Sequence, residues 1–155
     1  MKKIVKAIII GTTLFIPFLG AAGLYEGEES EACFGSSPDI ILQDNCITAA
    51  VEKSNKKVDA LIRETSKQIK AYMPGPFDYK DPDNPDSPTI GEVYNQRFLK
   101  AQVSWKRYKA ELCLAVAGQI PEESLTYQRS LDQCEMNLNK RHMAEIRAMH
   151  IEELK

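Results

Sequence analysis

Four cysteines constrain the fold of this chain more than any other feature of its sequence: Cys33, Cys46, Cys113 and Cys134. No two of them have the C-x-x-C spacing of a zinc site or a redox dithiol. An even number of cysteines in an exported chain of this size indicates two disulfides, and three pairings are available. Bonded sulfurs are not nucleophiles, so we expect a crosslinked scaffold and no catalytic thiol.

The first 22 residues indicate export. Three lysines precede an apolar run from Ala7 to Leu19, and small residues follow it. This is the layout of a secretory signal peptide, with cleavage expected after Ala22. A retained membrane anchor is the alternative, but Gly11 and Pro17 interrupt a run that is already shorter than the roughly 20 apolar residues of a spanning helix. We therefore expect a periplasmic or secreted protein.

The charge balance bears on the kind of partner. Removal of residues 1–22 takes three lysines from a chain with 20 basic and 22 acidic residues, which leaves 17 against 22 and a net charge near −5. General nucleic-acid binding requires a positive field, so this balance disfavours it. An acidic protein of this kind suits a basic protein partner.

Hydrophobic periodicity predicts helices along most of the remaining chain. Residues 23–36 have no clear pattern and are expected to be a flexible lead-in to a single domain over residues 37–155. From Cys46 an apolar stripe has helical spacing and ends at Met73, where two prolines follow. Its members are Ile47, Val51, Val58, Ile62, Ile69 and Tyr72. Residues 74–89 contain five prolines and four aspartates and are predicted to be a loop.

Two further helices are predicted after this loop. Thr89 and Glu92 have the spacing of a capping box, and Gly118 is expected to end the helix that it opens. The apolar stripe of that helix is Tyr94, Phe98, Ala101, Trp105, Tyr108, Leu112 and Ala115. The last helix is predicted to start at Pro121-Glu122-Glu123, with a helical signal to Leu154 and the stripe Leu131, Cys134, Leu138, Ile146 and Met149.

The predicted fold is therefore all-α, a small disulfide-stabilised bundle of three main helices. A short connection between the last two helices would bring Cys113 close to Cys134, and Cys33 is close to Cys46 in the sequence. We therefore favour the pairs Cys33–Cys46 and Cys113–Cys134. The alternative is a Cys46–Cys134 bond between the first and last helices.

The spacing Q-x-x-W-x-x-Y-x-x-x-x-C, formed by Gln102, Trp105, Tyr108 and Cys113, resembles the signature of the LprI-like lysozyme-inhibitor domain family. The later segment CEMNLNKRHMAEI is similar to the closing segment of that family, with Cys134, Leu138 and Ile146 in the expected places. The sequence departs from the family pattern at Lys109, Asn139 and His142, where the family commonly has Arg, Thr and Arg. The resemblance implies an exported, disulfide-stabilised helical domain, and one branch of the family is associated with lysozyme inhibition.

The acidic loop is the first candidate for partner binding, through Asp78, Asp81, Asp83 and Asp86. A solvated linker is the plain interpretation, and the intervening prolines depart from an EF-hand calcium loop. A proline-stiffened acidic loop would also suit the basic rim of a lysozyme. The competing surface is the basic flank formed by Lys100, Lys106 and Arg107, which could face anionic wall polymers or membrane headgroups.

We find no motif for catalysis, and no cofactor or metal site is expected. The two histidines, His142 and His150, are separate, and we expect His142 to be a packed structural residue. The resulting prediction is an exported, non-catalytic binding protein whose partner is lysozyme or another cell-wall hydrolase. The alternatives are an immunity protein against a cell-wall-degrading toxin and an envelope chaperone or structural component.

Overall fold

The computed structural model describes residues 23–72, 84 and 86–151, and these residues form four helices and no strand. The helices are α1 (Glu28–Ser36), α2 (Ile40–Tyr72), α3 (Ile90–Ala117) and α4 (Leu125–Arg147). The all-helical class is confirmed. The count of three main helices holds for α2, α3 and α4, and α1 is an additional short helix that the prediction lacked.

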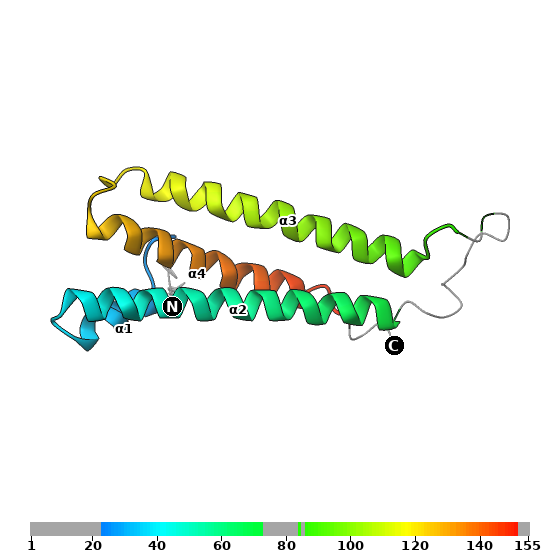
Figure 1. The fold of residues 1–155 in the computed structure, drawn as a ribbon, viewed down its shortest axis with the longest axis horizontal. Coiled ribbons are helices and arrows are strands. Elements are labelled where there is room, and N and C mark those ends of the chain that lie inside the picture. The colour runs from blue at the N-terminus through cyan, green and yellow to red at the C-terminus, as the bar shows by residue number, and fades with distance from the viewer. Residues whose placement is uncertain (1–22, 73–83, 85, 152–155) are drawn as a thin grey trace, which may run out of the picture.

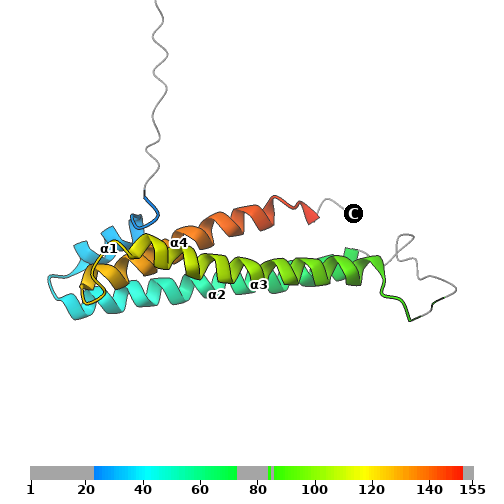
Figure 2. The same ribbon diagram turned by 90° about the horizontal axis from the view of Figure 1, so that it is seen from above.

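The three long helices form an elongated bundle. Helices α2 and α4 run in the same direction and α3 runs against them (Figure 1). Each of the three contacts the other two, and Figure 2 shows α4 set beside the layer that α2 and α3 form. Helix α1 lies alongside the first turns of α2 and contacts both α2 and α4. The start of α2, all of α1 and the α3–α4 turn therefore share one end of the bundle.

The segment predicted to be a flexible lead-in contains α1, so that prediction was wrong. Acidic residues occupy its first turn, where the helix dipole favours negative charge. Ser30 and Cys33 are buried on the side of α1 that faces the bundle. Helix α2 also begins earlier than Cys46, at Ile40, where the Asp39 carboxylate accepts a hydrogen bond from the Ile41 amide at 2.9 Å.

Apolar side chains from α2, α3 and α4 meet along the bundle axis. The largest cluster joins Val58, Ile62, Ile69, Phe98, Ile146 and Ile151. Two smaller clusters surround the disulfides, one with Ile47 and Met136 beside Cys33, the other with Leu138 beside Cys113 and Cys134. The apolar stripe predicted for the first long helix is confirmed at Ile47, Val58, Ile62 and Ile69, all of which are buried.

Helix α3 has the predicted capping box but not the predicted buried face. The Thr89 hydroxyl accepts from the Glu92 amide at 3.1 Å, and the Glu92 carboxylate accepts from the Thr89 amide at 2.8 Å. Tyr108, expected in the core, is 56% exposed. The buried residues of α3 include Phe98 and Cys113. They also include three polar residues, Asn95, Gln102 and Lys109. The helix is therefore rotated relative to the prediction, by less than the 100° that one residue spans.

Helix α4 is shorter at both ends than the sequence suggested. It begins at Leu125, after a turn in which the Ser124 amide donates to the Pro121 carbonyl at 2.9 Å, so Glu122 and Glu123 precede the helix. The Ser124 hydroxyl accepts from the Thr126 amide at 3.1 Å. The helix ends at Arg147, and His150 adopts a φ of 48° in the left-handed region. This change of direction returns the buried side chain of Ile151 to the core.

Candidate functional site

Both disulfides lie toward the end of the bundle that contains α1, and their pairing is the one predicted. Cys33 of α1 is bonded to Cys46 of α2, and Cys113 of α3 is bonded to Cys134 of α4. The Cα atoms are 5.6 Å apart in each pair. All four helices are therefore crosslinked in two pairs at this end, which restricts how far its surface can rearrange.

Amide side chains of α4 hold α1 and the residues before it in place. Gln133, which is fully buried, accepts hydrogen bonds from the amide and hydroxyl of Ser30 at 3.0 and 2.6 Å. One turn later Asn137 donates to the carbonyls of Leu24 and Glu26 at 2.9 and 2.8 Å. Lys140 then pairs with Glu29 at 2.7 Å. The position of α1 is therefore specified by one face of α4.

Arg129 of α4 contacts both α1 and α2 at the same end of the bundle. Its guanidinium contacts the Asp44 carboxylate at 2.9 Å and the Gln43 side chain at 3.2 Å, both in α2. It also lies over the Phe34 ring of α1, 4.3 Å from the ring centroid. A single cation of α4 thus fixes the relative height of α1, α2 and α4.

Large apolar side chains are exposed just beyond the contacts of Arg129, toward the tip of the bundle. Ile40, Ile41 and Leu42 are 50%, 70% and 55% exposed at the start of α2, and Leu125 is 52% exposed at the start of α4. Ile40 precedes Asp44 by four residues and Leu125 precedes Arg129 by four, and the two helices run in the same direction. The Asp44–Arg129 contact therefore places both groups at the same height, about 6 Å further toward the tip.

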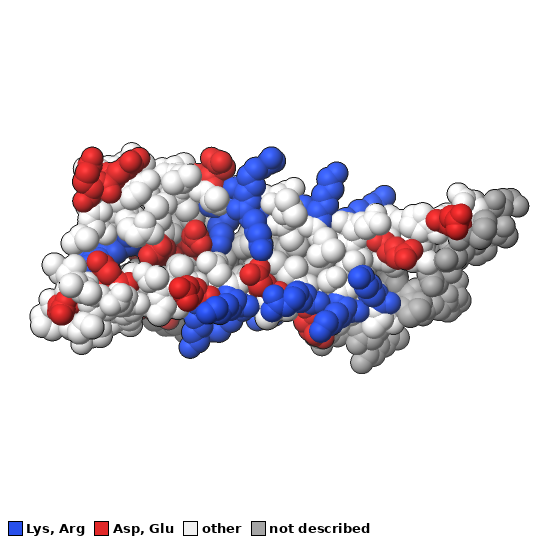
Figure 3. Space-filling model, viewed as in Figure 1, with Lys and Arg blue, Asp and Glu red and all other residues white. Residues whose placement is uncertain are grey.

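The same end is mainly acidic, and the cations that contact it, Arg129 and Lys140, are both paired with carboxylates. Residues 23–46 and 110–128 contain no Lys or Arg. They contain nine acidic residues: Glu26, Glu28, Glu29, Glu31, Asp39, Asp44, Glu111, Glu122 and Glu123. Figure 3 shows acidic side chains gathered at this end and Lys and Arg gathered over the middle of α2 and α3. We refer to the exposed residues Glu31, Asp39, Ile40, Ile41, Leu42, Glu122, Glu123 and Leu125 as the acidic end.

Two carboxyl groups behind this surface have shifted pKa values of opposite sign. Burial raises the pKa of Asp132, and the neighbouring carboxylates of Glu135 and Asp44 raise it further, against a hydrogen bond from Gln128 that lowers it. Burial also acts to raise the pKa of Glu29, but hydrogen bonds from Lys140 and Gln133 outweigh it and lower that pKa. The folded protein therefore disfavours the ionised form of Asp132 and favours the ionised form of Glu29.

The motif residues of helix α3 form part of a polar layer inside the bundle. Trp105 is half-buried and stacks on His142 of α4, with ring centroids 3.9 Å apart and planes 9° from parallel. His142 Nε2 lies 2.6 Å from Gln102 Oε1. The structural role expected for His142 is confirmed, and Leu138 is buried beside the Cys113–Cys134 bond. Tyr108 faces solvent and takes no part.

Lys109 is the buried cation of this layer. Its ammonium donates to Asn55 at 3.0 Å, Glu135 at 3.1 Å and Asn139 at 3.3 Å. Asn139 also donates to Asn55 at 2.8 Å, which closes the network between α2, α3 and α4. Lys109, Asn139 and His142 are the positions at which the sequence departs from the family pattern that it resembles. They lie together, so the departures belong to one interhelical contact.

Two of the hollows on the described surface lie between helices. The first, of about 280 Å³, lies between α2 and α3 beside this network and is lined by Asn55, Val58, Asp59, Trp105, Lys106, Lys109 and Asn139. Its charges are matched within the protein, because Lys106 pairs with Asp59 at 2.8 Å and Lys109 with Glu135. It therefore has no unbalanced charge with which to select a charged ligand.

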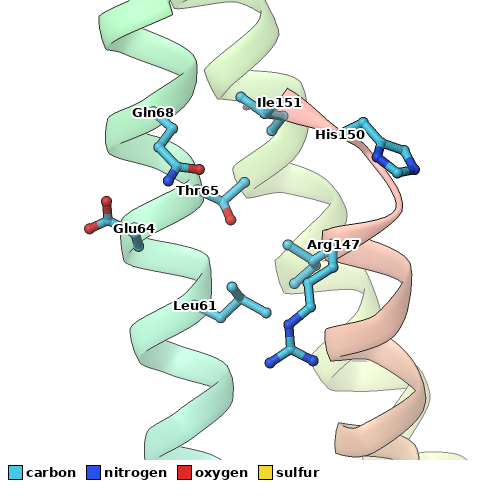
Figure 4. A pocket seen from close by; sticks show the side chains of 8 residues that line it. Leu61, Glu64, Thr65, Gln68, Arg147, His150 and Ile151 are labelled. Atoms are coloured by element: carbon cyan, nitrogen blue, oxygen red, sulfur yellow. The ribbon is translucent and has the colours of Figure 1, made fainter. Parts of the chain in front are cut away.

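The second hollow, of about 350 Å³, lies between α2 and the end of α4. Figure 4 shows Leu61 of α2 and Arg147 of α4 facing one another across it, with His150 turned away. Its lining mixes apolar residues with Thr65, Gln68, His150, one carboxylate and one guanidinium. No group of three or more His, Cys, Asp or Glu side chains is placed to hold a metal ion in the part of the chain that the structure describes.

Only one of the four predicted partner-binding aspartates can be located. Asp86 is exposed just before α3, whereas Asp78, Asp81 and Asp83 lie outside the described residues. The acidic end was not predicted as a site, because its two acidic segments are far apart in the sequence. The absence of Lys and Arg from residues 23–46 and 110–128 is visible in the sequence, but no sequence signal places these two segments next to one another.

Comparisons with known proteins give no relative for this chain: no family model, no curated protein and no solved structure matches it. Among the described helices, none is both long and apolar enough to cross a membrane.

Proposed function

We propose that this chain is an exported, non-catalytic binding protein that inhibits lysozyme or a similar basic cell-wall hydrolase by covering its surface. The observation that carries the proposal is the acidic end, where exposed apolar side chains are surrounded by carboxylates on helices crosslinked by two disulfides. The resemblance of Gln102, Trp105, Tyr108 and Cys113 to the LprI-like pattern supports the same class of partner.

The two kinds of residue at the acidic end would have separate roles. The carboxylates raise the rate of encounter with a basic enzyme and orient it. Ile40, Ile41 and Leu125 then bury apolar area, at about 25 cal/mol per Å² removed from water. Apolar anchors near the centre of an interface, with a charged rim, are the usual arrangement in protein complexes. The disulfides limit the conformational entropy that binding would remove.

The proposal is tested by the rate at which hen egg lysozyme clears a suspension of bacterial cell walls. At low ionic strength, the disulfide-bonded protein should slow the clearing with saturation near one inhibitor per enzyme, and about 0.5 M salt should weaken the effect because it screens the carboxylates. The Ile41→Ser variant should inhibit at least about 10-fold less well, as expected when an interface anchor of 1.4 kcal/mol or more is removed.

A matched control is available on α3. Val103 is 70% exposed, as Ile41 is, but lies outside the acidic end. Val103→Ser should therefore inhibit as well as the unmodified protein. Similarly, Glu122→Gln with Glu123→Gln should weaken inhibition at low salt, whereas Glu64→Gln on the middle of α2 should not. The proposal fails if wall clearing is unchanged at low ionic strength, or if Ile41→Ser and Val103→Ser behave alike.

A further inference from the structure

The middle of the molecule has a surface of opposite charge to the acidic end. Six cations project from α2 between residues 53 and 70, and all six are exposed: Lys53, Lys56, Lys57, Arg63, Lys67 and Lys70. We refer to these six residues as the basic ridge. Figure 3 shows Lys and Arg side chains in a band along α2, with few acidic side chains among them.

Most of the basic ridge is not neutralised by the protein itself. Within the described residues, Lys53, Lys57, Arg63, Lys67 and Lys70 form no ion pair, and Lys56 has only an exposed contact of 3.5 Å with Glu52. Asp59 lies within the same stretch of α2, but its carboxylate is engaged by Lys106 of α3 at 2.8 Å. The carboxylates left beside the ridge are those of Glu52 and Glu64, two against six cations, so the surface retains a positive field.

The basic ridge extends along the axis of α2. Its cations lie one to six residues apart and extend over about 26 Å of helix, since each residue adds 1.5 Å. Near its start lies a shallow depression of the helix surface, lined by Lys53, Lys56 and Lys57 together with Ala49, Ala60 and one carboxylate, Glu52. The small side chains leave the lysine stems room to lean toward a ligand that lies along the helix.

We infer that the basic ridge binds a linear polyanion, a chain of repeated phosphate or carboxylate groups such as an anionic polymer of the cell wall. A linear chain follows the ridge and avoids the acidic end of the same molecule. A planar anionic membrane would extend past both surfaces, so it would gain attraction at the ridge and suffer repulsion at the acidic end. The negative net charge of the whole chain similarly disfavours a broad, nonspecific attraction.

This inference does not rest on the proposed inhibition of lysozyme, and it is tested with a different ligand. The probe is fluorescently labelled long-chain inorganic polyphosphate, and the readout is anisotropy of the disulfide-bonded protein at several salt concentrations. The variant carries Lys53→Gln, Arg63→Gln and Lys67→Gln, none of which removes an intramolecular contact. We expect at least about 10-fold weaker binding and a plot of log affinity against log salt that is less steep by about 2, since three cations no longer release counterions.

The matched control removes three other exposed cations, through Arg97→Gln, Arg141→Gln and Arg147→Gln, so its net charge equals that of the ridge variant. It should lose less than about 3-fold in affinity. Circular dichroism checks that both variants keep their helices. The inference is overturned if polyphosphate does not bind at low salt, or if both triple variants lose affinity equally. It is also overturned if phosphatidylglycerol vesicles bind more tightly than polyphosphate through the same three residues.

Discussion

At the scale of single residues, the polar side chains inside the bundle define its packing. Lys109, Asn139 and Gln133 are buried, yet each has its hydrogen bonds within the protein. No buried side-chain nitrogen or oxygen among the described residues lacks a partner. A satisfied network of this kind fixes the rotation of each helix, because a helix turned by one residue would leave several polar groups unpaired.

Lys109→Met tests the energetic importance of this network. The substitution keeps the length of the side chain but leaves Glu135, Asn55 and Asn139 without their shared donor. Because the Glu135 side chain remains 33% exposed, we expect a loss of about 2–3 kcal/mol in the free energy of unfolding, measured by urea denaturation. Lys106→Met breaks a pair that is exposed on both sides and should cost about 0.5 kcal/mol or less. Equal losses in the two variants would contradict the role assigned to Lys109.

Asp132 and Glu29 predict pH effects of opposite sign. The folded-state pKa of Asp132 is raised above 3.8, so its contribution to stability is present below pH 3.8 and is lost as the pH rises through the folded value. Asp132→Asn should therefore stabilise the protein more at pH 7 than at pH 3, as measured by the shift in melting temperature at each pH.

Glu29 is the internal control for this prediction. Its folded-state pKa is lowered below 4.5, so its contribution is present above pH 4.5 and is lost as the pH falls through the folded value. Glu29→Gln should thus be more destabilising at pH 7 than at pH 3. The assignment would be wrong if both variants shifted the melting temperature by the same amount at the two pH values.

At the scale of the elements, α1 differs from the other helices in what stabilises it. It has nine residues, too few for a helix that is stable by itself in water. Its position depends on the Cys33–Cys46 bond and on the hydrogen bonds that Gln133 of α4 accepts from Ser30. In contrast, α2, α3 and α4 bury apolar side chains along most of their length.

Removal of the Cys33–Cys46 bond should therefore release α1 selectively. The double variant Cys33→Ala/Cys46→Ala should lose about 3 kcal/mol in the free energy of unfolding, the value expected for a loop of this size. Amide hydrogen exchange should become fast in α1 and stay slow in the middle of α3 and α4. Unchanged protection of α1 would show that the hydrogen bonds from α4 suffice to hold it.

At the scale of the whole molecule, the bundle is elongated and has two separate surfaces of opposite charge. The acidic end contains no Lys or Arg, whereas the six cations of the basic ridge lie along the middle of α2 (Figure 3). The two surfaces lie on one bundle but share no residue. Under the two proposals, a basic enzyme and an anionic polymer bind at separate surfaces of one molecule. The variants that test one surface leave the other intact, so the lysozyme and polyphosphate measurements have independent outcomes.

Part of this organisation follows from the sequence alone. The 3.6-residue spacing of Ile47, Val58, Ile62 and Ile69 identifies the buried face of α2, because apolar side chains at that interval must share one side of a helix. The capping box at Thr89 marks the start of α3 for an equally local reason. Short separations along the chain favoured the two disulfide pairs over the Cys46–Cys134 alternative, and the structure confirms the favoured pairs. The sequence likewise predicts a signal peptide and a resemblance to the LprI-like family, which stay predictions.

The tertiary structure decided the rest, because the interactions concerned join residues distant in the sequence. The buried face of α3 contains Asn95, Gln102 and Lys109, whose burial is favourable only once partners on α2 and α4 are in place. An apolar pattern cannot reveal such positions, so Tyr108 was wrongly placed in the core. Helix α1 depends on Gln133, more than 100 residues away. The acidic end exists only because folding brings residues 23–46 next to residues 110–128, where their like charges add.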